Sequence, residues 1–386
     1  MYQRVKRSDL KPGMFVISHG LGTFGSPLVN VGAHILCLSN LCDYVPEDVE
    51  DVLIARTQDA LLEGATALGA PVTVSLAEEL PQARRLYSEA LSYVRHFLED
   101  VRKGTSIDFS PATPLVENLI ESVFRNENAA VTLCKLRGFD EYTYTHSINV
   151  SILAVLLGKR MGLDRAALLK IGLAGLLHDV GKARLPAKIL NKPGRLSETE
   201  FHAVKGHSMW SHDLLKQQGD MPRDILRAVA EHHERHDGSG YPRGLQGHEI
   251  SLFSRIIAVA DVFDALTSKR AYKDAMPPAQ ALSMMYQWRG KQFATEDIEF
   301  FIQCIGVFPV GSFVRLTDGE HGIVISTNPH RPTKPQVKVV LDAKLRPRLP
   351  RVLDLEALEA THEAQDIAEV LNPADYKIDM GRFFSV

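Results

Sequence analysis

Residues 167–182 read Ala-Leu-Leu-Lys-Ile-Gly-Leu-Ala-Gly-Leu-Leu-His-Asp-Val-Gly-Lys, and this stretch decides how the rest of the chain is arranged. Positions 167–177 are apolar on almost every side, which is typical of a helix that is buried all round. Asp179 follows with no obvious surface to face. Because an unpaired buried carboxylate costs several kcal/mol or takes up a proton, the pattern predicts a divalent cation beside Asp179.

Further side chains that bind metals stand at intervals along the chain, each in a segment of helical character. Five are histidines and two are aspartates: His146, His178, Asp179, His207, His232, His233 and Asp261. Imidazole and carboxylate without thiolate favour Fe, Mn, Co, Ni or Zn in a catalytic site over a closed structural zinc. Seven ligands are too many for one ion. We therefore expect five helices to bring them together around two ions, with His178 on one and Asp179 bridging both.

The expected chemistry is hydrolysis of a phosphate ester. Two cations about 3.5–4 Å apart turn a shared water into hydroxide at neutral pH and hold a phosphoryl oxygen for in-line attack. Lys182, three residues after Asp179, would share its face if the helix continued, and its ammonium could neutralise the phosphate under attack. Arg270 and Lys273 follow Asp261 as a basic patch suited to a second phosphate. A solvated helix end is the alternative interpretation of that patch.

Composition excludes several classes of protein. The chain has 386 residues with 45% hydrophobic content, enough for two or three domains, and a formal charge of −3 gives no general attraction to nucleic acid or to anionic membranes. Its four cysteines are scattered, without a CxxC pair. No apolar run reaches the roughly 18 residues of a membrane helix, and the N-terminus lacks the apolar core of a signal peptide. We expect a cytoplasmic protein without a membrane span.

The chain divides into three parts with a mainly α fold class. Residues 1–105 predict a small α+β domain, with short apolar pieces between turn signals and then a helix over 76–102. The segment 103–111 breaks this helix, and we place the domain boundary there. Residues 308–386 predict a small β appendage with strands at 311–316, 322–326 and 336–341. Between them, in 111–305, the expected helices lie at 114–126, 142–161, 165–180, 197–217, 222–234, 252–268, 278–289 and 295–305.

Three motifs together resemble the HD-GYP subgroup of the HD phosphohydrolases. They are His178-Asp179-x-x-Lys182, His232-His-Glu-Arg-His-Asp-Gly-Ser-Gly-Tyr-Pro242 and Asp261-Val-Phe-Asp-Ala-Leu-Thr-Ser-Lys-Arg-Ala-Tyr-Lys273. The resemblance covers about 111–305 and implies an all-helical core that hydrolyses cyclic di-GMP to pGpG or GMP. It implies the seven metal ligands named above, a loop formed by Gly240, Tyr241 and Pro242, and phosphate contacts from Lys182, Arg270 and Lys273. Residues 11–16 are similar to the opening of DUF3391, a small module of unknown function.

One position departs from the family pattern. Some members bind a third metal through a glutamate one helical turn before the first histidine, and Tyr142 stands there in this chain. Glu141 lies five residues from His146 and about 140° round the helix, so it is a poor substitute. We therefore expect a binuclear centre, which leaves open whether both phosphodiester bonds are cut. Fe and Mn are the leading candidates, with Ni, Co and Zn as alternatives.

Alternatives remain for single residues and for the whole protein. Asp264 is as compatible with a structural role as with a contact to substrate or to a ligand, and Tyr241 is either a packing residue or a hydrogen-bond donor. The protein could instead be an HD hydrolase of another nucleotide, such as (p)ppGpp or a dNTP, which the Gly-Tyr-Pro loop speaks against. It could also be a non-catalytic sensor of cyclic di-GMP, although a degenerate sensor would be expected to lose ligands. The sequence leaves open a homodimer or a signalling protein as a further partner.

Overall fold

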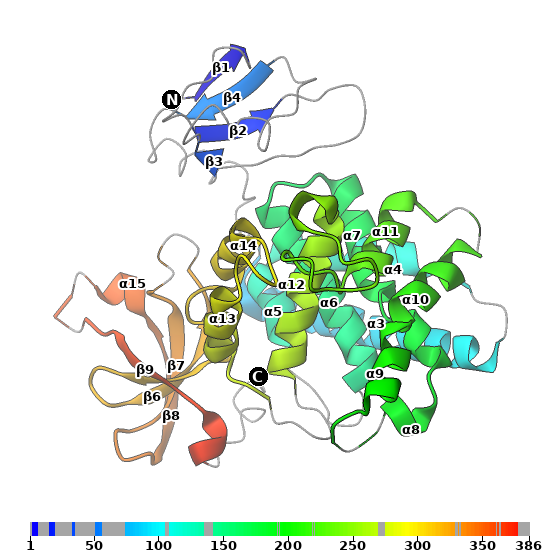
Figure 1. Cartoon of the computed structure of the whole chain (residues 1–386). Coiled ribbons are helices and arrows are strands. Elements are labelled where there is room, and N and C mark those ends of the chain that lie inside the picture. The colour runs from blue at the N-terminus through cyan, green and yellow to red at the C-terminus, as the bar shows by residue number, and fades with distance from the viewer. Residues whose placement is uncertain are drawn as a thin grey trace.

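A computed structural model gives the fold of the chain (Figure 1). Near the N-terminus four short strands form an antiparallel sheet in the order β1-β4-β2-β3. They are β1 (Tyr2–Lys6), β2 (Phe15–His19), β3 (Ala33–His34) and β4 (Asp51–Ala55). The predicted β character of this region is confirmed at 15–17 and 51–54, whereas most of the segment similar to DUF3391 lies outside the described residues. The structure describes residues 2–6, 15–19, 33–34, 51–55, 74–104, 108–134, 142–190, 192, 194–217, 219, 221–268, 275–328, 331, 333–359, 361–362 and 364–376.

Helices packed around one hydrophobic core make up the middle of the molecule. The predicted mainly α architecture is confirmed. Its α-helices are α3 (Leu76–Lys103), α4 (Ala112–Arg125), α5 (Glu127–Leu133), α6 (Tyr142–Arg160), α7 (Arg165–Leu177), α8 (Ala187–Leu190), α9 (Glu198–Lys205), α10 (His207–Lys216), α11 (Arg223–Glu231), α12 (Leu252–Thr267), α13 (Pro278–Gln287) and α14 (Thr295–Ile305). Two 3₁₀ helices, η4 (Val180–Arg184) and η5 (Gly247–Glu249), lie between them. Among the residues that the structure describes, no helix combines the length and apolar character needed to cross a membrane.

Three predicted helices end earlier than expected, and the same interaction marks each of these ends. The helix expected at 222–234 ends at Glu231, where the His232 ring bonds the carbonyl of Val229. The helix expected at 165–180 ends at Leu177, and the one expected at 197–217 is two helices that meet at Gly206. At each end a histidine ring nitrogen hydrogen-bonds a backbone carbonyl three residues back, His178 to Gly175 and His207 to Val204. A side chain that binds one of the last carbonyls supports the end of a helix.

Glycines allow the close approaches that build the centre of the bundle. A Cβ on Gly175 of α7 would lie 2.9 Å from the Cα of Ser151 on α6, so only glycine lets these two backbones touch. A Cβ on Gly181 would lie 2.3 Å from the carbonyl oxygen of His207, and the Gly181 N–H donates to Ser211 Oγ at 2.8 Å. Gly181 therefore holds η4 against the start of α10, which brings Asp179 beside His207.

Helix α3 packs with the bundle, contrary to the expected boundary at 103–111. Its buried face, which includes Tyr87 and Val94, belongs to the same core as α4, α5 and α6, and the Tyr87 hydroxyl donates to Asn149 Oδ1 at 2.9 Å. The break in the pattern ends one helix of this core: Gly104, with φ of +67°, caps α3 in the left-handed conformation. We propose that the boundary lies before Leu76.

A five-stranded antiparallel sheet follows the helices, in the order β8-β7-β6-β5-β9. Its strands are β5 (Phe313–Leu316), β6 (His321–Ser326), β7 (Gln336–Leu341), β8 (Pro347–Asp354) and β9 (Ile367–Leu371), with α15 (Leu355–Leu358) and η6 (Pro373–Tyr376). The predicted β appendage and its first three strands are confirmed, but β8 and β9 were not predicted. Strand β8 is mostly exposed and lacks the alternation of a half-buried strand. Asn128 of α5 joins the sheet to the bundle through hydrogen bonds with Ser326 and Thr327.

Candidate metal centre

The structure brings the seven predicted ligands together from five helices of the bundle. His146 lies on α6 and Asp261 on α12; His207 is the first residue of α10; His178 and His232 cap the C-termini of α7 and α11, and Asp179 and His233 follow them. Their nitrogen and oxygen atoms form three overlapping groups, each with all its atoms within 4.8 Å of one another. The groups are Asp179 with His207, His232 and His233; His146 with His178 and Asp179; and His178 with His232 and Asp261.

The two oxygens of the Asp179 carboxylate face different histidines. Oδ1 lies 3.1 Å from His207 Nε2 and 3.9 Å from His232 Nε2. Oδ2 lies 3.2 Å from His178 Nε2 and 3.5 Å from His146 Nε2. The side chain of Asp179 is only 9% exposed. This carboxylate therefore stands between two groups of nitrogen ligands, one on each oxygen.

Backbone carbonyls fix the tautomers of three of these histidines. In each case the carbonyl can only accept, so Nδ1 carries the proton and Nε2 keeps a free lone pair. The bonds run from His178 to Gly175 (2.8 Å), from His207 to Val204 (2.5 Å) and from His232 to Val229 (2.7 Å). Among the described residues, the buried atoms His178 Nε2 and Asp179 Oδ1 have no hydrogen-bond partner. Such orphaned acceptors in a buried site fit a divalent cation.

The charges in the cluster suit metal binding as well. Burial by itself would raise the pKa of Asp179, but interactions with His178 and Lys182 outweigh it and hold that pKa well below its usual range. For Asp261 burial is likewise outweighed, by the hydrogen bond and charge of His146, and its pKa is lowered too. Burial lowers the pKa of His232 well below its usual value and that of His233 to about 3. Charged carboxylates and neutral imidazoles are the forms that bind metals.

Asp264 lies behind His146. Its Oδ2 accepts a hydrogen bond from His146 Nδ1 at 2.8 Å, its Oδ1 accepts one from Asn149 Nδ2 at 2.9 Å, and the residue is 1% exposed. A carboxylate that binds the far nitrogen of a histidine fixes its ring and makes its other nitrogen a better metal ligand. This position favours a role in which Asp264 supports the metal ligand His146 over one in which it contacts substrate.

Lys182 reaches the cluster, although not along a continuing helix. The 3₁₀ helix η4 begins right after Asp179, and the Lys182 ammonium donates to Asp179 Oδ2 at 2.5 Å. Of the other residues considered, Arg270, Lys273 and Glu141 lie outside the described residues, as does the side chain of Tyr142. Their predicted roles stay predictions.

Comparison with known proteins agrees with this geometry. Residues 114–295 match the HD domain model, and residues 313–378 match a KOW domain associated with the HD domain. The cyclic di-GMP phosphodiesterase PA4108 of Pseudomonas aeruginosa is 35% identical over 370 residues, which cover 92% of this chain and 89% of that protein. The chain belongs to the HD-GYP family of HD-domain proteins.

Two further relatives extend the comparison. The 3'3'-cGAMP-specific phosphodiesterase 3 of Vibrio cholerae is 41% identical over 144 residues, which cover 37% of this chain and 31% of that protein. Among solved structures, the HDG"Y"P protein Bd1817 from Bdellovibrio bacteriovorus matches with a TM-score of 0.50 and 15% identity, over 78% of this chain and 98% of that one. At that identity the structural match shows the HD-GYP fold alone.

The HD-GYP loop, which we define as residues 238–244, packs against the metal centre. The ring of Tyr241 lies 4.8 Å from that of His233, between centroids. Burial, with Asp261 and Asp179 nearby, raises the pKa of Tyr241, so its phenol is neutral near pH 7. A Cβ on Gly240 would lie 2.3 Å from the backbone nitrogen of Arg235, so this position accepts only glycine.

Two buried glutamates that hold the HD-GYP loop were missed in the sequence. Glu234 accepts the backbone N–H of Arg243 at 2.7 Å on one oxygen and that of Leu245 at 3.0 Å on the other. Glu231 accepts the N–H of Ser251 at 3.2 Å and also pairs with the Arg243 side chain. The one available signal was that both flank the adjacent histidines in Glu231-His-His-Glu234. Their partners, which lie up to 20 residues away, come into contact only through the fold.

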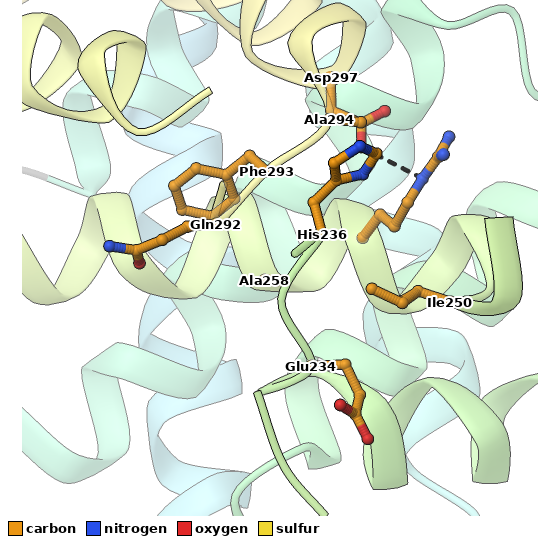
Figure 2. Close-up of a pocket in the computed structure, with 9 residues that line it drawn as sticks. Glu234, His236, Ile250, Ala258, Gln292, Phe293, Ala294 and Asp297 are labelled. Atoms are coloured by element: carbon orange, nitrogen blue, oxygen red, sulfur yellow. Dashed lines mark ion pairs between the residues drawn. The ribbon is translucent and has the colours of Figure 1, made fainter. Parts of the chain in front are cut away.

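A second polar cluster lies around His236 (Figure 2). Asp297 of α14 is 0% exposed, and its Oδ2 lies 3.2 Å from Arg255 Nε of α12. The cluster lines a cavity of about 10 Å³, room for roughly one water. Backbone bonds from His236 N to Gln292 O (3.1 Å) and from Asp237 N to Lys291 O (2.8 Å) tie the chain before the HD-GYP loop to this region.

Proposed function

We propose that this chain is a metal-dependent phosphodiesterase that hydrolyses cyclic di-GMP to pGpG or GMP. The observation that carries the proposal is the Asp179 carboxylate, whose two oxygens face two groups of histidine nitrogens. One divalent ion would be held by His146, His178, Asp179 and Asp261, and a second by Asp179, His207, His232 and His233. Fe and Mn suit this set of nitrogen and oxygen donors, with Ni, Co and Zn as alternatives.

The site's own residues prepare the reaction. Two bound divalent ions supply Lewis acidity, which makes water nucleophilic at neutral pH and offsets charge on the phosphoryl group. Asp179 and Asp261 hold their negative charge in a buried place, and Asp264 orients the ring of His146. The ammonium of Lys182 is 28% exposed, so it can reach a phosphate oxygen at the edge of the site. It would neutralise the phosphate under attack.

The substrate class follows from charge and from the relatives. A chain with a net charge of −3 attracts an anion only through a local group of cations. Gly240, Tyr241 and Pro242 border the centre, and we keep Arg270 and Lys273 as proposed phosphate contacts. The match to PA4108 over 92% of this chain supports cyclic di-GMP, since that relative is named for this activity.

A second candidate substrate is 3'3'-cGAMP, which differs from cyclic di-GMP in one base. A relative named for that substrate is 41% identical over part of the HD region. Both substrates present the same phosphodiester bonds to the metal centre, so contacts with the bases must distinguish them. A non-catalytic sensor is disfavoured because all seven metal ligands are present.

The test is hydrolysis by purified wild type, Asp179→Ala and Asp213→Ala, with metals quantified in all three. Asp213 is a matched control, an aspartate on α10 whose side chain is 50% exposed. We expect wild type and Asp213→Ala to cleave cyclic di-GMP faster than 3'3'-cGAMP. Asp179→Ala should lose metal and roughly a thousandfold in rate while staying folded, since Lewis-acid stabilisation is worth several kcal/mol. Full activity of Asp179→Ala would refute the assigned role.

A further inference from the structure

We propose that Lys205, together with the rings of Tyr241 and Phe201, forms a subsite, separate from the contacts proposed for Arg270 and Lys273, for the second, uncleaved phosphate of a cyclic dinucleotide and for a neighbouring base. This inference rests on the proposed function and deepens it. Lys205 is the last residue of α9, two positions before His207. Its ammonium therefore enters the site from the same turn that supplies a metal ligand.

The ammonium of Lys205 lies over two aromatic rings. Its Nζ is 5.3 Å from the centroid of Tyr241 and 4.9 Å from that of Phe201. The ring of Tyr241 in turn lies 4.8 Å from that of His233. Tyr241 thus neighbours both the Lys205 cation and a residue of the metal centre. Because Tyr241 belongs to the HD-GYP loop and Phe201 to α9, the position of the cation depends on two separate elements.

The ammonium of Lys205 has no hydrogen bond or ion pair with any residue of the described part of the chain, so its charge is available. The two rings hold the ammonium through cation–π attraction, which is weaker than a charge-assisted hydrogen bond to phosphate. Lys182, by contrast, already donates to Asp179. The two lysines therefore differ in role: Lys182 serves the phosphate at the metal centre, and Lys205 serves an anion beside Tyr241.

Phe201 adds a place for a base. It is 49% exposed although it is a large apolar residue. Single exposed apolar side chains are common on proteins and need no function. Phe201, however, shares the Lys205 cation with a ring of the HD-GYP loop, so it lies at the edge of the catalytic site. Aromatic rings exposed beside a phosphate-binding cation are a recurrent way to stack nucleobases.

The substrate's own geometry requires such a site. A cyclic dinucleotide carries two phosphates on opposite sides of one macrocycle, with a base next to each. When one phosphate occupies the metal centre, the other lies across the ring, away from the metals. A cation beside Tyr241, with the exposed ring of Phe201 next to it, suits that second phosphate and its base.

The experiment compares the metal-loaded full-length wild type with Lys205→Gln, Lys205→Arg, Phe201→Leu and the control Lys216→Gln. Lys216 is an exposed lysine at the far end of α10. Kinetics measures the KM for cyclic di-GMP, with calorimetry measuring its affinity if the wild type does not cleave it, and kinetics also measures hydrolysis of bis(p-nitrophenyl) phosphate, which has a single phosphate. We expect Lys205→Gln to weaken cyclic di-GMP binding roughly tenfold, the loss of one charged contact. Phe201→Leu should weaken it severalfold, whereas Lys205→Arg and Lys216→Gln stay close to wild type.

Hydrolysis of bis(p-nitrophenyl) phosphate should be unchanged in Lys205→Gln, because that substrate has no second phosphate to place beside Lys205. The proposal would be overturned if Lys205→Gln bound cyclic di-GMP as tightly as wild type does. It would also be overturned if the variant lost binding of cyclic di-GMP and hydrolysis of bis(p-nitrophenyl) phosphate by the same factor. If the wild type binds cyclic di-GMP without cleaving it, only the proposed hydrolysis is refuted. The ratio of the affinities of wild type and Lys205→Gln for cyclic di-GMP then still decides whether the subsite exists. A wild type that does not bind cyclic di-GMP overturns both.

Discussion

The chain that leads into the HD-GYP loop passes two buried carboxylate clusters, one at His233 and one at His236, and they solve the same electrostatic problem differently. At Asp297 the protein supplies its own cation, the guanidinium of Arg255 at 3.2 Å. At Asp179 and Asp261 it supplies a single ammonium, that of Lys182 on Asp179, and otherwise imidazoles, several with their lone pairs turned inward. A buried carboxylate surrounded by neutral donors is built for a cation from outside, whereas one that faces an arginine is part of the scaffold.

The carboxylates of the two clusters also differ in protonation. The pKa values of Asp179 and Asp261 are held well below their usual range despite burial, so these groups stay charged. Burial raises the pKa of Asp297 to about 7, because one guanidinium offsets it only in part and Glu296 adds to the rise. One cluster keeps its charge ready for a ligand, and the other holds a proton close to neutral pH.

Removing metal should have the largest effect on activity, and metal content should distinguish the two clusters. We expect a strong chelator to reduce the hydrolysis of cyclic di-GMP roughly a thousandfold, because the Lewis acids are lost, and Mn²⁺ or Fe²⁺ to restore it. Asp297→Asn should contain as much metal as wild type in elemental analysis. Undiminished activity after the metals have been removed would contradict the assignment of the first cluster.

Asp264 tests how the metal centre is held in place, with a smaller effect. We expect Asp264→Ala to weaken metal binding about 10–100-fold, because the ring of His146 loses the group that orients it. Asp264→Asn keeps an oxygen that can accept from His146 Nδ1 and should recover part of the affinity. The measurement is a competition titration with a metal indicator. Equal metal affinity in Asp264→Ala and wild type would assign Asp264 a purely structural role.

Much of the helical fold was predictable because local signals decide it. Ser197 and Glu200 form a capping box at the start of α9, and α14 begins and ends at the predicted residues. The ends of α7 and α9 could not be predicted, because each depends on a histidine ring that turns back to a carbonyl. The packing of α3 with the bundle was also not predicted, since the partners of its apolar stripe are far away in sequence.

The seven candidate ligands were predictable for a different reason. Their residue types and their place in three specific motifs point to one site, and the structure brings all seven together. The supporting residues carry no such signal: Asp264 behind His146, Glu234 under the HD-GYP loop and Lys205 beside Tyr241 depend on contacts between separate elements. These contacts exist only once α6, α9, α12 and the loop are packed.

The Asp297 cluster gives the smallest and most specific prediction, a change in how stability depends on pH. In the unfolded chain an aspartate has a pKa of about 3.9, so between about pH 4 and 7 the native state keeps a proton on Asp297 that the unfolded state has lost. The native state binds more protons in this window, and stability therefore falls as pH rises through it, by up to roughly 4 kcal/mol in total. Asp297→Asn cannot ionise and lacks this loss. Urea unfolding of both proteins, each with excess chelator so that the metal centre contributes equally, should show the free energy of unfolding of the variant rising relative to wild type from pH 4.5 to 7.5. If the free energies of unfolding of the two proteins changed in parallel with pH, Asp297 would be ionised in the fold, held so by Arg255 with His236 beside it. The two clusters would then differ in the groups that face their carboxylates and not in the protonation of those carboxylates.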